Sequence, residues 1–208
     1  IGIFRLSNRR FISRPAALYV EIFRNIPALV LIIFWAFAFP NILPAEARTA
    51  ILFDNTITNG IAALTGLPVP YYALAVIIAL TLNTSAYLAE IFRAGVGTIA
   101  QEHLDAARTL GASKLFVLGQ ILLPQGLRAA FPAISTRLVH NMKNTALAAF
   151  VSVPVFFHSI NTSISRSFRA LEFLMLAAIV YLILYFLFTS LLRWIESSMR
   201  RQPILKNG

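Results

Sequence analysis

The stretch DAARTLGASKLFVLGQILLP, Asp105–Pro124, lies between two apolar segments that are each long enough to cross a membrane. We expect a helix from about Ile99 to Leu110. Gly111 follows it and can turn left-handed at no steric cost. Ser113 can cap a second short helix, which we expect Pro124 to end. The stretch therefore predicts a helix, a glycine elbow and a second helix, held clear of the membrane.

The start of the first short helix carries a capping pattern. Thr98 and Gln101 have the spacing of a capping box, in which the hydroxyl serves an early helical amide and the Gln side chain reaches back. Asp105 lies near the helix start, where a negative charge is favoured, and Arg108 is one turn further on. We expect a rigid helix with a local ion pair, although Asp105 is equally suited to meeting charges on a partner.

The composition is that of a membrane protein. The chain has 208 residues, of which 58% are hydrophobic and 12% charged, and its mean hydropathy is +0.75. It has no cysteine and only three scattered His residues, so we expect no disulfide, no metal site and no catalytic residue. The net charge of +10 would suit nucleic acid only on a soluble basic surface, and we expect no nucleic-acid partner.

The basic residues have another explanation, which is membrane topology. Twelve of them flank the predicted spans on one side. They are Arg5, Arg9, Arg10, Arg14, Arg93, Arg108, Lys114, Arg128, Arg193, Arg200, Arg201 and Lys206. The opposite loops carry only Arg48, Arg166 and Arg169. The positive-inside rule therefore places the first set, and the C-terminus, in the cytoplasm.

Hydropathy predicts an all-α, multi-span membrane protein with a single transmembrane domain over residues 1–208. The four full spans are expected at about 16–39, 71–92, 132–157 and 171–192, and Ile1–Leu6 reads as the tail of an earlier one. Residues 93–128 form the cytoplasmic loop and residues 40–70 the outer loop, with a short helix at about 51–64. The last span should face lipid over much of its surface.

Polar residues gather on one face of two of these spans. In the second span Asn83, Tyr87 and Glu90 share a helix face, and Glu90 can pair with Arg93. In the third span a polar stripe is expected at about 100° per residue. It comprises Arg137, His140, Asn141, Asn144, Thr145, Ala148 and Ser152.

Such a stripe has two interpretations: it lines a hydrated pathway, or it hydrogen-bonds to neighbouring helices. We favour the pathway and predict that Asn83, Tyr87, Arg137, Asn141 and Asn144 line it. The charge of Arg137 would suit acidic or neutral solutes better than cationic ones. The chain has no G-x-x-x-x-G-K-[ST] phosphate loop, so we expect a transport subunit and no enzyme.

The central stretch also resembles the EAA loop of bacterial ABC importer permeases. The matching positions, with matching spacings, are Asp105, Ala106, Ala107, Gly111, Ile121, Leu123 and Pro124. Further blocks match in order, as in the polar amino acid uptake branch. They are YVEIFRNIPAL (19–29), AYLAEIFRAG (86–95), LPQGLRAAFP (123–132), MKNTAL (142–147) and SFRALE (167–172). The chain departs from the pattern at Asp105, where Glu is usual, at Asn144, where Asp is common, and at Ala146, where Ser is common.

The resemblance implies a type I ABC importer permease fold in the bacterial cytoplasmic (inner) membrane. It implies that Asp105, Ala106, Ala107, Arg108 and Gly111 belong to a coupling helix seated in a cleft of an ATPase subunit. The implied partners are a second permease chain, identical or different, two ATPase subunits, an extracytoplasmic substrate-binding protein and membrane lipid. ATP and Mg would be bound by the ATPase subunits, with no cofactor in this chain, and the substrate would be a polar amino acid.

Two other classes of function stay open from the residues alone. One is a standalone channel or secondary carrier for a small polar solute, in which the polar stripe lines a pore and the central loop acts as a gate. The other is a purely structural membrane subunit of a larger complex. Dependence on ATP and co-purification of an ATPase would separate an importer from the first, and loss of transport on mutation of the stripe would separate it from the second.

Overall fold

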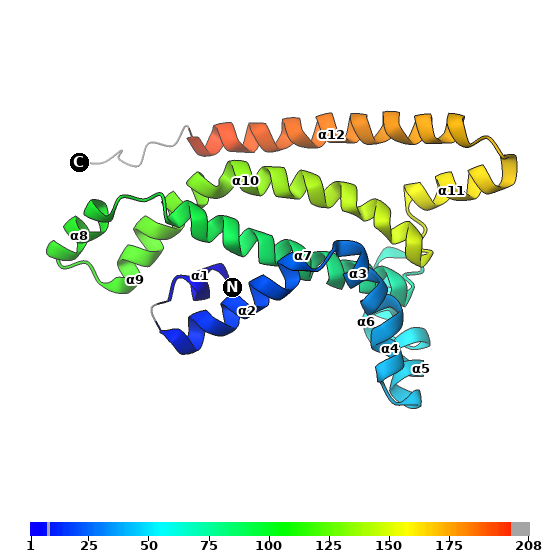
Figure 1. Cartoon of the computed structure of the whole chain (residues 1–208), viewed down its shortest axis with the longest axis horizontal. Helices are drawn as coiled ribbons and strands as arrows, with labels where there is room; N and C mark the ends of the chain where they lie inside the picture. The colour runs from blue at the N-terminus through cyan, green and yellow to red at the C-terminus, as the bar shows by residue number, and fades with distance from the viewer. Residues whose placement is uncertain (8, 201–208) are drawn as a thin grey trace. The chain divides into compact units, whose positions relative to one another are not determined.

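The computed structural model describes residues 1–7 and 9–200, apart from the side chain of Arg200. Arg201 and Lys206, which belong to the predicted cytoplasmic basic set, lie outside the described residues. Within the described part of the chain every regular element is helical, as predicted from the sequence (Figure 1).

The helices follow one another with short connections. The first half contains α1 (Gly2–Arg5), α2 (Arg10–Asn25), α3 (Ala28–Ile33), a π-helical segment (Phe34–Ala38), α4 (Phe39–Ile42), α5 (Ala45–Phe53), α6 (Thr56–Thr65) and α7 (Tyr71–Val96). The second half contains α8 (Gln101–Thr109), α9 (Lys114–Phe116), a π-helical segment (Val117–Leu122), α10 (Leu123–Asn144), a 3₁₀ segment (Thr145–Val151), α11 (Phe156–Ser167) and α12 (Ala170–Arg200).

The chain divides into two compact units. The first comprises Ile1–Ile22, Ser85–Val139 and the chain from Leu184 onward. The second comprises Phe23–Thr84 and His140–Ile183. Its core joins α3 and α7 to the 3₁₀ segment, and Ile32 and Val151 are its largest fully buried side chains.

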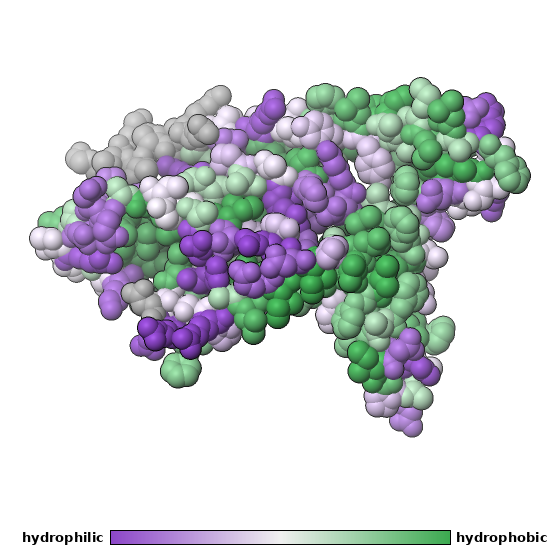
Figure 2. All heavy atoms as spheres, viewed as in Figure 1, coloured by the Kyte–Doolittle hydropathy of each residue, from purple (hydrophilic) through white to green (hydrophobic). Residues whose placement is uncertain are grey.

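Two described helices are long and apolar enough to cross a membrane unaided: Tyr71–Val96 and Ala170–Met199. They contain the predicted second and last spans and extend beyond them. Counting each of two broken helix pairs as one span raises the number to as many as four, so the predicted four spans are the upper limit. Only 6% of the most apolar window of Ala170–Met199 is buried, against 44% for Tyr71–Val96, and Figure 2 shows a hydrophobic surface over the first part of α12. This exposure fits the predicted contact with lipid.

The first predicted span, 16–39, is not one continuous helix. α2 ends at Asn25, and α3 begins at Ala28 after Pro27, whose backbone is extended (φ −56°, ψ 139°). Proline lacks the amide that would continue the helix, and it disfavours helical backbone at Ile26. The break leaves carbonyl groups without helical partners. Asn83 satisfies two of them, since its Nδ2 donates to the carbonyl oxygens of Phe23 (2.8 Å) and Ile26 (3.3 Å).

The third predicted span, 132–157, is also interrupted. α10 ends at Asn144 and a tighter 3₁₀ segment follows, after which Ser152 takes a left-handed conformation with φ 57°. A 3₁₀ helix has about three residues per turn, so a stripe spaced for an α-helix cannot continue through it. The predicted stripe is therefore wrong beyond Asn144: Ala148, for example, is 2% exposed within the core of the second unit.

The predicted outer helix at about 51–64 is two helices. α5 ends at Phe53, and Asn55 starts α6, its Oδ1 accepting from the amides of Ile57 (2.9 Å) and Thr58 (3.3 Å). An Asn at this position satisfies amides that have no helical partner, so it favours a new helix start. Gly66, with φ 70°, ends α6.

Candidate functional site: the coupling segment and the polar residues of the spans

The predicted glycine elbow is confirmed. α8 ends at Thr109 and Gly111 has φ 82°. The amide of Gly111 donates to the carbonyl of Arg108 (2.9 Å), and the amide of Ala112 donates to that of Ala107 (3.0 Å). This pair of bonds is the Schellman arrangement, which requires left-handed backbone at the glycine. Ala107 therefore contributes a carbonyl that fixes the turn.

The second short helix starts as predicted and ends differently. The Ser113 side chain accepts from the Phe116 amide (3.2 Å), so its predicted capping role is confirmed. Pro124 does not end the helix, and that prediction is wrong. α9 runs into the π-helical segment Val117–Leu122 and then into α10, with Pro124 as the second residue of α10. A π segment shifts the hydrogen-bond register by one residue, which lets a helix continue past a residue without an amide.

The predicted capping box at the start of α8 is wrong. Ala100 is the residue before the helix, and its methyl group cannot cap the α8 amides. The Thr98 hydroxyl donates instead to the carbonyl of Gly95 (2.8 Å), in the last turn of α7. The side chain of Gln101 donates to Asp105 Oδ1 (3.2 Å) rather than reaching back. The hydroxyl therefore serves the preceding helix, because that helix also leaves carbonyls to be satisfied.

Residues 93–128, which we call the coupling segment after the role that the resemblance implies, combine exposed charge with exposed apolar side chains. Arg108 Nη1 lies 2.9 Å from Asp105 Oδ1, the predicted local pair, and both side chains are more than half exposed. Leu104 is buried, whereas Leu110 is 88% and Leu115 80% exposed. Figure 2 shows hydrophilic residues gathered over α8 with hydrophobic residues beside them. Leu104 thus packs inside the chain, while Leu110 and Leu115 present apolar surface.

Two of the predicted pathway residues lie together in the first unit. The guanidinium carbon of Arg137 lies 3.7 Å from the centroid of the Tyr87 ring, a cation–π contact. Such a contact holds a half-buried cation over an aromatic face.

The other three predicted pathway residues lie in the second unit. Asn83 is buried and holds the α2–α3 break. Asn141 Oδ1 accepts from the Thr84 hydroxyl (2.8 Å), and the Asn144 amide lies 3.3 Å from His140 Nδ1. We had not predicted Thr84 as a partner, although a hydroxyl in a span usually bonds to another helix. These contacts serve both interpretations of the stripe, because they order the helices and also place polar groups inside them.

Glu90 lies in an ion triad rather than in a simple pair. Its predicted bond to Arg93 is confirmed at 2.6 Å, and Arg5 from the chain start binds its other oxygen at 2.8 Å.

Among the described residues no cluster of three or more His, Cys, Asp or Glu side chains is arranged to hold a metal ion.

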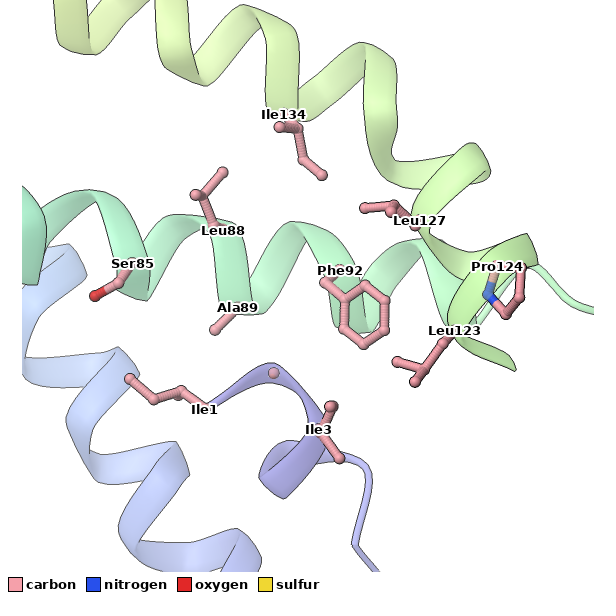
Figure 3. A pocket seen from close by; sticks show the side chains of 11 residues that line it. Ile1, Ile3, Ser85, Leu88, Ala89, Phe92, Leu123, Pro124, Leu127 and Ile134 are labelled. Carbon is pink, nitrogen blue, oxygen red and sulfur yellow. The ribbon is translucent and has the colours of Figure 1, made fainter. Parts of the chain in front are cut away.

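One large cavity of about 670 Å³ lies in the first unit (Figure 3). Figure 3 shows Phe92 and Leu88 of α7 and Leu123 and Leu127 of α10 around it, with Ile1 and Ile3 on the other side. Ser85 carries the one hydroxyl among the described residues of its wall, and that hydroxyl is hydrogen-bonded to Tyr19 (2.7 Å). The cavity is therefore too apolar to be the route of a polar solute.

Comparison with known proteins decides the family. Residues 1–201 match the family described as "Binding-protein-dependent transport system inner membrane component". The chain belongs to this family. As a member of it the chain is a transport subunit of the bacterial inner membrane, as the resemblance of its ordered sequence blocks implied.

Two relatives of this inner membrane component show how far the likeness extends. It is 30% identical over 200 residues to the histidine/lysine/arginine/ornithine transport system permease protein HisM of Escherichia coli K12, covering 94% of this chain and 76% of that protein. It is 29% identical over 182 residues to the probable amino-acid ABC transporter permease protein YckA of Bacillus subtilis 168, covering 87% of this chain and 70% of that protein.

Two solved structures share the fold. A crystal structure of an amino acid ABC transporter with histidines aligns with a TM-score of 0.71 at 24% identity, covering 95% of this chain and 81% of that one. An inward-facing MetNI methionine ABC transporter aligns with a TM-score of 0.66 at 17% identity, covering 92% and 77%. At these identities the likeness establishes the type I ABC importer permease fold and nothing finer.

Proposed function

We propose that this chain is the permease subunit of an ATP-driven importer of amino acids and that residues 93–128 couple it to partner ATPase subunits. The observation that carries the proposal is the elbow at Gly111. It combines the full EAA spacing with a rigid Schellman turn, and exposed Leu110 and Leu115 flank it. A short, stiff, partly apolar projection has the properties of a docking element for a protein cleft.

The proposed mechanism uses this projection as a lever. Two ATPase subunits bind ATP and Mg and close on one another. Each carries a seated α8 with it, so α7 and α10, the helices at the two ends of the segment, are displaced. A second permease chain, identical or different, supplies the other half of the pathway, and a substrate-binding protein delivers the amino acid from outside. ATP acts by favouring one conformation through differential affinity.

The route of the amino acid is proposed to pass Asn83, Tyr87, Arg137, Asn141 and Asn144. The support is that four of these side chains are half-buried rather than sealed in the core, and that their polar groups face protein within apolar helices. Relatives named for amino acid transport support a polar amino acid as substrate. The Arg137 cation favours an acidic or neutral one, because a like charge would be repelled.

The first test targets the elbow with a matched control. Gly111→Val places a β-branched residue where φ is 82°, whereas Gly119→Val adds the same side chain at an exposed glycine of the same segment with open space around it. We expect Gly111→Val to abolish co-purification of the ATPase and substrate-stimulated ATP hydrolysis in reconstituted membranes, and Gly119→Val to retain both. Full retention by inserted Gly111→Val protein would favour a standalone channel or carrier.

The second test maps the route. The chain has no native cysteine, so single cysteines at the five positions can be labelled with a water-borne thiol reagent. We expect labelling that changes when substrate and ATP are added, with a cysteine at fully buried Ala75 as the protected control. Protection of all five positions under every condition would mean that these residues only join helices.

A further inference from the structure

The end of α7 and the start of α10 meet backbone to backbone. A Cβ atom at Gly95 would lie 2.7 Å from the Gly126 carbonyl oxygen and 3.0 Å from the Ala130 amide nitrogen. The first distance is shorter than real Cβ atoms show and the second is tighter than nearly all of their contacts, and both neighbours are main-chain atoms that cannot rotate away. Gly95, Gly126 and Ala130 are buried. The two helices therefore approach as closely as their backbones allow.

The contact is completed from the other helix by a side chain. A Cβ atom at Gly126 would lie 2.5 Å from Val96 Cγ2, whereas its next neighbours, Val96 Cα and Phe92 Cε2, would lie at 3.4 and 3.5 Å. Figure 3 shows Phe92 on α7 and Leu127 on α10 beside the cavity that borders this contact. One methyl group of Val96 therefore occupies the space that a residue at position 126 would need. We call Gly95, Val96, Gly126 and Ala130 the neck contact.

The neck contact closes the base of the coupling segment. Gly95 and Val96 are the last two residues of α7, and Gly126 is the fourth residue of α10. Within the segment the glycines differ: a Cβ at Gly111 or at Gly119 would meet nothing within 4 Å. The segment is thus open at Gly111 and Gly119 and tightly packed where it joins α7 and α10.

We propose that Gly95 and Gly126 are positioning residues for energy coupling. They hold the end of α7 and the start of α10 as one body, so that a displacement of α8 moves both helices together rather than bending one of them. This inference rests on the proposed importer function, and it adds the place at which the lever is joined to the spans. Interiors packed at this density transmit displacement instead of absorbing it.

The test is a volume exchange across the neck contact, made in the complete transporter with its ATPase subunits and binding protein in proteoliposomes. The readout is the number of amino acids imported per ATP hydrolysed, at equal amounts of inserted permease. Gly126→Ala overpacks the contact and should lower this ratio about tenfold. Val96→Ala leaves a gap and should lower it about threefold. The double variant V96A/G126A places the new Cβ in the space that Val96 Cγ2 vacates and should come within about twofold of the unchanged protein.

Two further variants make the result specific. V96A should not rescue Gly95→Ala, because the obstacle there is the backbone of Gly126 and Ala130. Gly119→Ala, in open space within the same segment, should leave the ratio unchanged. If Gly126→Ala fails to insert, the comparison of V96A with V96A/G126A still decides the matter.

Clear outcomes would overturn the inference. These are a normal ratio in inserted Gly126→Ala protein, or a double variant that couples no better than its impaired single variants. A transporter that, with no substitution, imports nothing on addition of ATP would instead overturn the proposed function.

Discussion

Gly111 and Gly126 lie in the same part of the chain and need to be glycine for opposite reasons. Gly111 has φ 82° and open space around the position of a Cβ. Gly126 has ordinary helical backbone within α10 and no space, because Val96 Cγ2 lies 2.5 Å from that position. One glycine is required by conformation and the other by volume.

The two glycines therefore have different roles in the coupling segment: Gly111 sets the direction of the projection, and Gly126 lets the projection pass its displacement to α7 and α10. The elbow sets the direction of the projection and is limited by its backbone conformation alone, since no described atom lies within 4 Å of a Cβ at Gly111. The base of the segment tolerates no bulk, since it joins two helices. A residue that accepts left-handed backbone but adds volume should therefore be tolerated at Gly111 and not at Gly126.

The largest effect is expected from asparagine at the packed position. Asparagine accepts left-handed backbone better than most residues but carries a side chain. Gly126→Asn should destabilise the protein by about 3 kcal/mol or more, because it overpacks a buried contact and buries an amide without a partner. Gly111→Asn should change stability by less than about 0.5 kcal/mol. Thermal unfolding of the detergent-solubilised protein measures both, and equal melting temperatures for the two variants would contradict the comparison.

A smaller effect is expected from alanine at the elbow. Gly111→Ala adds one methyl group in open space, so only backbone strain remains, about 1–2 kcal/mol for an L-residue in the left-handed region. Gly119→Ala is the control, and it should be neutral or slightly stabilising because alanine favours helix over glycine. Amide hydrogen exchange over α8 and α9 would locate the strain. Equal exchange in the two variants would mean that the elbow is not fixed by Gly111.

The elbow could be predicted from sequence because its causes are local. A glycine after a helical pattern and a Ser before the next helix determine backbone within a few residues. The neck contact could not be predicted in the same way, because it depends on which helices meet. Gly126 and Ala130 are four residues apart on one helix face, a spacing typical of helices that approach closely. This spacing is the feature of the sequence that could have indicated the neck contact.

The errors in the spans have the same origin. Pro27 signals a break that hydropathy alone passes over, because the residues on both sides are apolar. The switch from α-helix to 3₁₀ at Thr145 has no such local marker in this sequence, since it follows from packing of Ala148 and Val151 in the core of the second unit. Asn83 was predicted by its polarity, whereas its bonds to the Phe23 and Ile26 carbonyls arise only from that break.

Smaller losses of stability are expected when the hydroxyl on either side of the projection is removed, at Thr98 before α8 and at Ser113 after it. Ser113→Ala removes a cap whose bond to the Phe116 amide starts α9, so we expect a loss of about 1 kcal/mol. Thr98→Ala removes a bond to the Gly95 carbonyl and no cap of α8, so its loss should be about half that or less. Melting temperatures of the two variants test the order. A larger loss for Thr98→Ala would show that the hydroxyl matters more to the end of α7 than its single bond indicates.

The smallest effect on stability is expected at the exposed ion pair of α8. Asp105 and Arg108 are 60% and 57% exposed, so removing the pair by Asp105→Asn should change stability by less than about 0.5 kcal/mol. The same substitution should nevertheless lower ATPase co-purification if Asp105 meets charge on a partner, and Asp105→Glu, which keeps the charge, should retain it. Co-purification unchanged in both variants would assign the carboxylate to the local pair alone. Docking would then depend on the apolar surface of Leu110 and Leu115, which lies beside the elbow and not at its charged face.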